Sequence, residues 1–361
     1  MPADDFYSRY FRKQTFLSPG KDAIKNEVLK AQGLLDPENY RGKNVIEIGA
    51  GAGRLTFMLD QHGLLQTARR YTIVEPSSGI NQIRGLIGDR PNVSYMQCAF
   101  SEMVRHIPEQ SADYVIAHGV VPHIDQPLAE IFAQLKRMIN AQSGRIHVCS
   151  SFWGFDKKLG RALYHRVCRS NYFVRGTAAY ACTVAQRLCT GARSPGAWAR
   201  WFHRNFIYSI QPAFAGVARH HFEYFSAVPY NTHFTPQDYL HAANKAGLQL
   251  SRVYPYSIAL QFGRGVEKPD TLPSLDDMVA GNTRLVGEDD FFRDLVVETC
   301  RRRGFRFEKV LAPERAIAEK PQGVLVLGDN YYRRSSLQLI RSLENAGYRY
   351  NDSLFLFQML L

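Results

Sequence analysis

The sequence has few cysteines, and none has the spacing of a metal site. Six cysteines are scattered over 361 residues without a Cys-x-x-Cys pair. Such pairs are typical of zinc ribbons, and dense cysteines are typical of secreted disulfide scaffolds. We therefore expect reduced thiols in the cytoplasm and no bound metal.

Long apolar runs are also missing. No stretch approaches the roughly 18 uncharged apolar residues of a transmembrane helix. The nearest, residues 176–189, is interrupted by Gln186 and Arg187. The N-terminal segment opens with Asp4 and Asp5 and lacks the apolar stretch of a signal peptide. These absences predict a cytoplasmic protein.

Acidic residues are outnumbered. Lys and Arg total 45 against 33 Asp and Glu, a formal net charge of +12, while 45% of residues are hydrophobic. This composition excludes a largely disordered chain, and the charge excess indicates an anionic partner. Residues 153–224 hold eleven basic and two acidic residues, so this segment carries +9 of the total.

Short apolar runs alternate with amphipathic stretches in the first half of the chain, which is typical of stacked β-α-β units. The predicted strands cover residues 44–49, 71–75, 93–98, 113–119 and 145–151, and the predicted helices cover 54–62, 79–87, 102–105 and 128–139. Each strand is apolar enough to be buried on both faces. The pattern predicts an α/β protein with a mostly parallel sheet and helices on both faces.

The second half of the sequence predicts the last helix and strands of this sheet, followed by a further small unit. Thr235 as N-cap, Pro236 in the first turn and Gly247 at the end predict a helix over residues 234–248. Two strands follow around Pro255. The tail predicts two helices and two strands, at residues 289–303, 323–328, 333–346 and 353–357.

These patterns divide the chain into six segments. They are an N-terminal covering segment (1–43), a ligand-binding core (44–152), a basic helical cap insertion (153–225), the end of the core (226–265), a linker (266–277) and a small α/β accessory unit (278–361).

A glycine loop follows the first strand, where residues 45–56 read VIEIGAGAGRLT. Glycines let the backbone turn sharply and approach a ligand at a helix start. Dinucleotide enzymes use Gly-x-Gly-x-x-Gly, whose third glycine would fall on Arg54. Here the spacing is Gly-x-Gly-x-Gly, and the preceding Glu47 would repel a pyrophosphate but could pair with an ammonium group.

With this acid and loop the sequence resembles class I methyltransferases that depend on S-adenosylmethionine (SAM). SAM carries an ammonium group and no phosphate. The resemblance continues in order, with Glu75 ending the second strand, where the family's acid accepts ribose hydrogen bonds. Residues 113–118 and 121–124 are similar to the fourth motif and its continuation. The family's acid after the third strand is missing, and Glu102 is the nearest one.

The resemblance covers residues 44–148 and 232–262 and implies a Rossmann-like fold with a seven-stranded sheet. It implies SAM as cofactor and S-adenosylhomocysteine as product. Adenine recognition then falls to backbone amides and Phe100, and His118 would lie beside the methyl donor. The implied cofactor-binding residues are Glu47, Gly49, Ala50, Gly51, Gly53, Glu75, Ala99, Phe100 and His118.

Methyl transfer to a hydroxyl is helped by a base near pKa 7, for which histidine suits. We expect His123 as the catalytic base, against the alternative of a helix-start residue that never meets substrate. His220 and His221 are adjacent but lack a third ligand at metal spacing. The aromatic residues Phe6, Tyr7, Tyr10 and Phe11 fit either a lid over the sulfonium or a hydrophobic staple.

The basic insertion has several interpretations: a site for a phosphorylated or carboxylated acceptor, a membrane-surface contact, a nucleic-acid footprint or a solvated face. We expect a small anionic or amphipathic acceptor bound by Arg161, Arg166 and Arg169. The alternatives are an RNA methyltransferase or nucleic-acid-binding protein, and a non-catalytic partner subunit with this fold. Oxygen, nitrogen and carbon acceptors share the fold and stay open, as do the oligomeric state and the role of the tail.

Overall fold

The computed structural model describes residues 26–149, residues 234–263 apart from Tyr256, and most of residues 272–360. The expected aromatic lid, most of the covering segment and the whole basic insertion lie outside the described residues. So do the candidate residues Phe6, Tyr7, Tyr10, Phe11, Arg161, Arg166, Arg169, His220 and His221.

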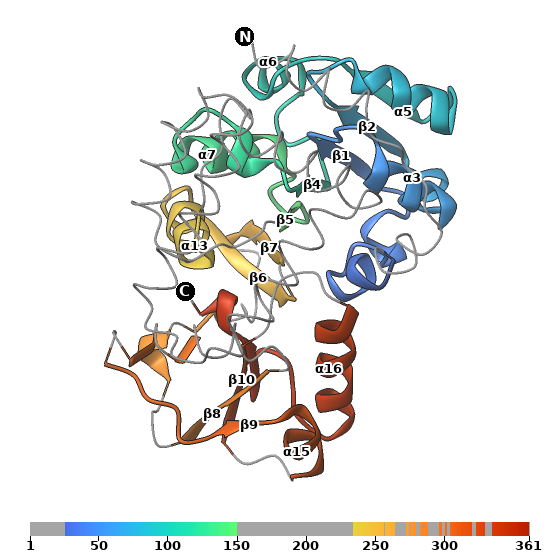
Figure 1. Ribbon diagram of the computed structural model, residues 1–361. Helices are drawn as coiled ribbons and strands as arrows, with labels where there is room; N and C mark the ends of the chain where they lie inside the picture. Colours follow the sequence, from blue (N-terminus) through green and yellow to red (C-terminus); the bar gives the residue numbers. More distant parts are fainter. Residues whose placement is uncertain are drawn as a thin grey trace, which may run out of the picture.

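A seven-stranded sheet forms the larger part of the fold, with the order β3-β2-β1-β4-β5-β7-β6 (Figure 1). Strands β1 to β5 are parallel, and β7 is antiparallel to both of its neighbours. The predicted mostly parallel sheet is confirmed. The strands are β1 (Asn44–Ile48), β2 (Arg70–Val74), β3 (Val93–Met96), β4 (Tyr114–His118), β5 (Arg145–Cys149), β6 (Leu248–Tyr254) and β7 (Ser257–Phe262).

Helices cover both faces of this sheet. On one face lie α3 (Arg54–Gln61), α4 (Leu64–Thr67) and α5 (Gly79–Ile87), and on the other lie α6 (Phe100–His106), α7 (Leu128–Met138) and α13 (Pro236–Lys245). Side chains alternate along β1 as expected for a strand. Val45 packs with the α3–α5 cluster, whereas Ile46 and Ile48 pack with the other.

The start of α13 follows the cap chemistry of its sequence. Thr235 Oγ1 accepts a hydrogen bond from the Asp238 amide at 3.1 Å, and Asp238 Oδ2 accepts one from the Thr235 amide at 2.7 Å. This reciprocal pair satisfies two amides that have no partner within the helix. The predicted N-cap is therefore confirmed.

A second, smaller parallel sheet follows, with the order β11-β10-β8-β9. Its elements are η5 (Leu275–Asp277), β8 (Thr283–Val286), β9 (Val310–Leu311), α15 (Pro313–Ala318), β10 (Val324–Leu327), α16 (Arg334–Asn345), β11 (Leu354–Leu356) and η7 (Phe357–Met359). The sequence did not predict β8, β9 or α15. Arg284 interrupts the apolar pattern of β8, yet it is buried and donates to Glu319 and to the Tyr348 hydroxyl.

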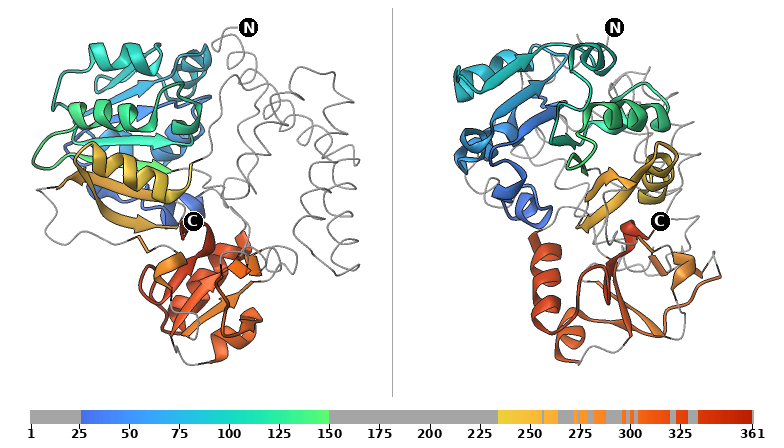
Figure 2. Two further views of the ribbon diagram at one scale, coloured as in Figure 1. Left: turned by 90° about the vertical axis from the view of Figure 1, so that its left-hand side faces the viewer. Right: turned by 180° about the vertical axis from the view of Figure 1, so that it is seen from behind.

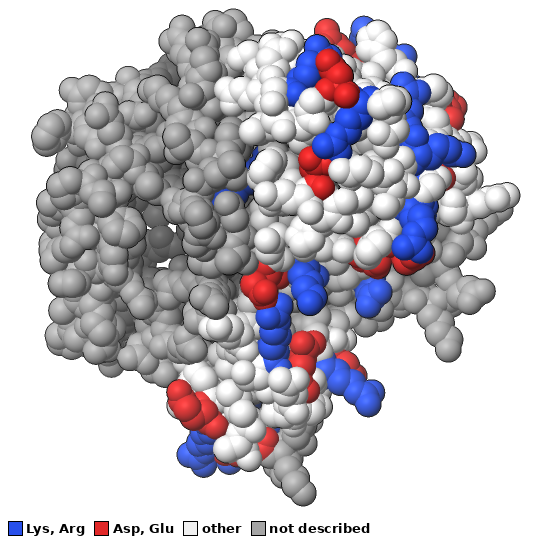
Figure 3. Space-filling model, turned by 90° about the vertical axis from the view of Figure 1, so that its right-hand side faces the viewer, with Lys and Arg blue, Asp and Glu red and all other residues white. Residues whose placement is uncertain are grey.

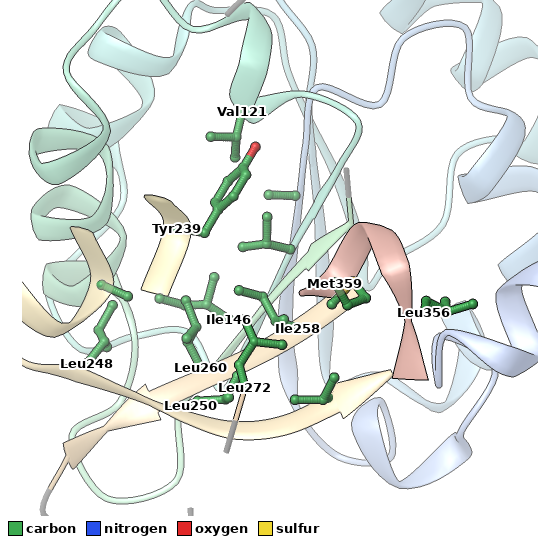
Figure 4. Packing of buried hydrophobic residues seen from close by; sticks show 14 of the residues in the cluster. Val121, Ile146, Tyr239, Leu248, Leu250, Ile258, Leu260, Leu272, Leu356 and Met359 are labelled. Carbon is green, nitrogen blue, oxygen red and sulfur yellow. The ribbon is translucent and has the colours of Figure 1, made fainter. Parts of the chain in front are cut away.

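The two sheets share one buried cluster. Leu250 and Ile258 of the large sheet lie close to Leu272 and Met359 (Figure 4). Both views in Figure 2 place the second sheet at the β6–β7 end of the first. Arg341 of α16 also forms an ion pair with Glu27. The second sheet therefore covers the end of the first sheet where β6 is the edge strand.

None of the helices among the described residues has the length and apolar character to cross a bilayer.

A buried polar network joins β4, β5 and β7. His147 bonds to the Tyr114 hydroxyl through Nδ1 at 2.8 Å and to Ser257 Oγ through Nε2 at 3.0 Å, and its ring stacks on Tyr254. Burial is the main cause that lowers the pKa of His147 to about 3, so the ring is neutral at physiological pH. Its two bonds satisfy both ring nitrogens, as a buried polar group requires.

Gln32 lies beside this network, and its backbone oxygen is 3.5 Å from Ser257 Oγ. Its side chain is fully buried, and within the described residues neither Oε1 nor Nε2 has a hydrogen-bond partner. A buried amide without partners carries a desolvation cost that no bond offsets.

We expect Gln32→Met to raise the free energy of unfolding by about 1–3 kcal/mol, because it removes this uncompensated group at similar volume. Urea denaturation measures the change. The control is Gln66→Met, because Gln66 is exposed and donates to Asp60 at 2.9 Å, and we expect little change there. A loss of stability in Gln32→Met would contradict the prediction.

Candidate functional site

The carboxyl ends of the parallel strands meet at one edge of the large sheet. The chain runs from β1 outward to β3 and returns to β4 on the other side of β1. Open α/β sheets bind ligands outside the strand ends at such a reversal. The predicted site residues lie at the carboxyl ends of β1, β2 and β4 or shortly after β1, β2, β3 and β4, and therefore lie along this edge.

The glycine loop after β1 needs its glycines for two reasons. Gly49 and Gly53 have φ values of 66° and 84°, which side chains rarely adopt. A Cβ at Gly49 would also lie 2.2 Å from Val120 Cγ2, and one at Gly53 would lie 2.5 Å from Ile83 Cγ1. The loop therefore packs directly against the residues after β4 and against α5.

Hydrogen bonds tie this loop to β2. The amides of Gly49 and Ala50 donate to Val74 O at 2.8 and 3.2 Å. The Gly51 amide donates to Glu75 Oε2 at 2.7 Å. The loop conformation is thus set by the neighbouring strand and by the acid that follows it.

Glu75 is buried, and its other oxygen also has partners. Oε1 accepts hydrogen bonds from the Ser77 amide at 3.0 Å and from Ser77 Oγ at 2.6 Å. Donors of this kind favour the ionised carboxylate. The sequence analysis did not predict a role for Ser77, although a serine two residues after the acid is visible in the sequence.

Glu47 lies on the face covered by α3. Its Oε2 accepts hydrogen bonds from Thr56 Oγ1 and from the Tyr71 hydroxyl, both at 2.8 Å. Burial raises the pKa of Glu47 to about 7, although both hydrogen bonds lower it, and the charge of Glu75 raises it further. The carboxyl is therefore partly protonated at neutral pH, and pairing with an ammonium group would draw it to its ionised form.

Residues after β3 start α6. The Ala99 amide donates to Glu102 Oε2 at 3.1 Å, which satisfies an amide at the helix start. Phe100 is 8% exposed and belongs to the buried cluster on the α6–α7 face. Adenine contact by Ala99 and Phe100 stays a prediction.

Both candidate histidines lie at the same sheet edge. His118 is the last residue of β4, pairs with Cys149 in the ladder and is half-buried. His123 ends the short helix η2 (Val121–His123), also half-buried, and its amide donates to Val120 O at 2.8 Å. Their roles beside the donor and as base stay predictions. In the part of the chain that the structure describes, no group of three His, Cys, Asp or Glu residues could hold a metal ion.

The groups at this edge fit S-adenosylmethionine. Two carboxyls, Glu47 and Glu75, flank the glycine loop, in which a side chain at Gly49 or Gly53 would clash with neighbouring residues. Glu47, just before the loop, disfavours a pyrophosphate and suits an ammonium group, whereas Glu75 suits sugar hydroxyls.

The raised pKa of Glu47 predicts a pH dependence of stability. A folded-state pKa of about 7 against the ordinary value of 4.5 means that the neutral form is favoured in the fold. The stabilisation is complete below pH 4.5 and is lost as the pH rises through 7, in total about 3 kcal/mol.

We therefore expect Glu47→Gln to lack the loss of unfolding free energy that the unaltered protein shows between pH 5 and 8. Urea denaturation across this range measures both proteins. His147 titrates equally in both, so the difference isolates Glu47. Parallel pH profiles would contradict the prediction.

Comparison with known proteins finds one matching family model and many similar solved structures. The family model described as "Methyltransferase domain" matches residues 46–144. No curated protein matches the chain.

Three solved structures illustrate the similarity. A chain from the complex of the Haloferax volcanii Trm112 methyltransferase activator with a methyltransferase is 12% identical, with 83% of this chain and 93% of that chain covered and a TM-score of 0.41. Geranyl diphosphate C-methyltransferase from Streptomyces coelicolor is 15% identical, with 71% of this chain and 82% of that chain covered and a TM-score of 0.38. An S-adenosylmethionine-dependent methyltransferase from Mesorhizobium loti is 15% identical, with 34% of this chain and 52% of that chain covered and a TM-score of 0.29. This chain therefore spans about half the length of that protein.

The matched segment contains the end of β1, the glycine loop, Glu75 and β4, which contribute to the sheet edge described above. Residues 46–144 of this chain therefore match the methyltransferase-domain family, and this match covers the elements of the candidate cofactor site.

Proposed function

We propose that this protein transfers a methyl group from S-adenosylmethionine to a small anionic or amphipathic acceptor in the cytoplasm. The observation that carries the proposal is the glycine loop at the reversal of strand order, tied through the Gly51 amide to Glu75. The residues Glu47, Gly49, Ala50, Gly53, Ala99, Phe100 and His118 complete the proposed cofactor site.

The bound cofactor supplies a methyl group on a positively charged sulfur. Because that charge disappears during in-line displacement, the protein's main tasks are to position the acceptor and exclude water. Glu75 would hold the ribose through its carboxylate. For a hydroxyl acceptor, His123 would take up the proton at a ring nitrogen.

The acceptor class rests on charge. Residues 153–224 carry +9 of the net +12, and they begin shortly after Cys149 at the carboxyl end of β5. On the face shown in Figure 3, the described residues instead carry interspersed positive and negative side chains. Arg161, Arg166 and Arg169 would thus bind a carboxylate or phosphate of the acceptor.

The first test concerns the cofactor. We expect Glu75→Ala to weaken S-adenosylmethionine binding at least about tenfold, because a charge-assisted hydrogen bond to the ribose is lost. Isothermal titration calorimetry measures the affinity. Glu130→Ala, at an exposed glutamate on α7, is the control and should bind as the unaltered protein does. Unchanged affinity in Glu75→Ala would contradict the assigned role.

The second test concerns the acceptor. A panel of carboxylated and phosphorylated small molecules, assayed with radiolabelled S-adenosylmethionine, identifies one that is methylated. For that acceptor, replacing Arg161, Arg166 and Arg169 by Ala should raise KM about tenfold or more and leave cofactor affinity unchanged.

The matched control replaces Arg41, Arg69 and Arg70, three exposed arginines at or near the amino ends of β1 and β2, and should leave KM unchanged. Equal effects of the first variant on acceptor and cofactor would contradict the substrate role. Steeply salt-sensitive RNA binding without small-molecule turnover would instead favour a nucleic-acid function.

A further inference from the structure

The turn between β2 and α5, residues 75–79, is built around one buried hydroxyl. Ser77 is fully buried, and its Oγ donates to Glu75 Oε1 at 2.6 Å and accepts from the Gly79 amide at 3.2 Å. Pro76 has no amide hydrogen, so the Ser77 amide is the first donor after Glu75, and it also donates to Oε1. One carboxylate oxygen is thus held twice by a single residue.

The same turn meets the glycine loop. Glu75 Oε2 accepts the Gly51 amide at 2.7 Å, so the carboxylate bridges the loop and Ser77. A Cβ at Gly79 would lie 2.3 Å from the Gly51 carbonyl oxygen and 3.1 Å from Ser77 Oγ. Loop and turn are therefore in direct contact, and Gly79 leaves the space that this contact needs.

The last torsion of a glutamate side chain has only broad minima, so a carboxylate is oriented by its partners and not by its rotamer. Here Ser77 supplies two hydrogen-bond donors to Oε1. Without the hydroxyl, Oε1 loses one of these two donors, and binding a ligand through Glu75 would then include the entropic cost of fixing the carboxylate.

We infer that Ser77 is a positioning residue for the cofactor: it orients the Glu75 carboxylate and holds the glycine loop against the start of α5. This inference rests on the proposed function, because it assigns Ser77 an effect on cofactor affinity that is exerted through Glu75.

The test is a double-mutant cycle on S-adenosylmethionine binding, measured by calorimetry with the full chain. Ser77→Ala should weaken binding about tenfold in the unaltered background and less than about threefold in the Glu75→Gln background. A residue that only stabilised the fold would give the same loss in both backgrounds.

Ser257→Ala is the matched control. Ser257 is equally buried and also bonds a buried side chain, His147, but it lies at the start of β7 away from the loop. Both variants should lose unfolding free energy, and only Ser77→Ala should lose cofactor affinity. If Ser77→Ala does not fold, Ser77→Cys, with a weaker donor of similar size, takes its place in the cycle.

The outcomes separate the two claims. Unaltered affinity in Ser77→Ala, or equal losses in both backgrounds, overturns the role of Ser77 and leaves the proposed function standing. Failure of the unaltered protein to bind S-adenosylmethionine overturns both.

Discussion

The cofactor end of the structure depends on one buried carboxylate. Glu75 accepts hydrogen bonds from the Gly51 amide on one oxygen and from Ser77 on the other. The bonds join two loops that follow neighbouring strands, β1 and β2. Removing the carboxylate would leave buried donors without acceptors, which costs more than the bonds themselves contribute. The loop proposed to face the cofactor is therefore held by the same group that is proposed to bind it.

A second carboxyl lies one strand away in a different environment. One oxygen of Glu47 accepts hydrogen bonds from two hydroxyl groups, which lower its pKa. Burial has the larger effect and raises the pKa to about 7. Glu75 instead is surrounded by donors that favour its charged form. The two acids beside one loop thus lie in different environments, because Glu47 faces α3 and the core whereas Glu75 accepts hydrogen bonds from backbone amides and Ser77.

The second sheet lies away from this edge of the large sheet. The second sheet packs on the β6–β7 end, where Leu272 and Met359 join the core of the large sheet. That contact covers an edge strand, which is otherwise exposed to pairing with other chains. The basic segment follows β5 in the sequence, whereas Glu75 follows β2, and these two strands lie on opposite sides of the strand-order reversal.

The sequence by itself determined the elements whose signals are local. The five parallel strands, the glycine loop and the Thr235 cap were predicted because apolar periodicity, glycine spacing and cap chemistry act within a few residues. Tertiary structure alone decided the rest. Arg284 lies in a buried strand where its two terminal guanidinium nitrogens donate to Glu319 and to the Tyr348 hydroxyl, and both partners are far from it in the sequence. The protonation of Glu47 and the role of Ser77 likewise depend on groups that only folding brings within hydrogen-bond distance.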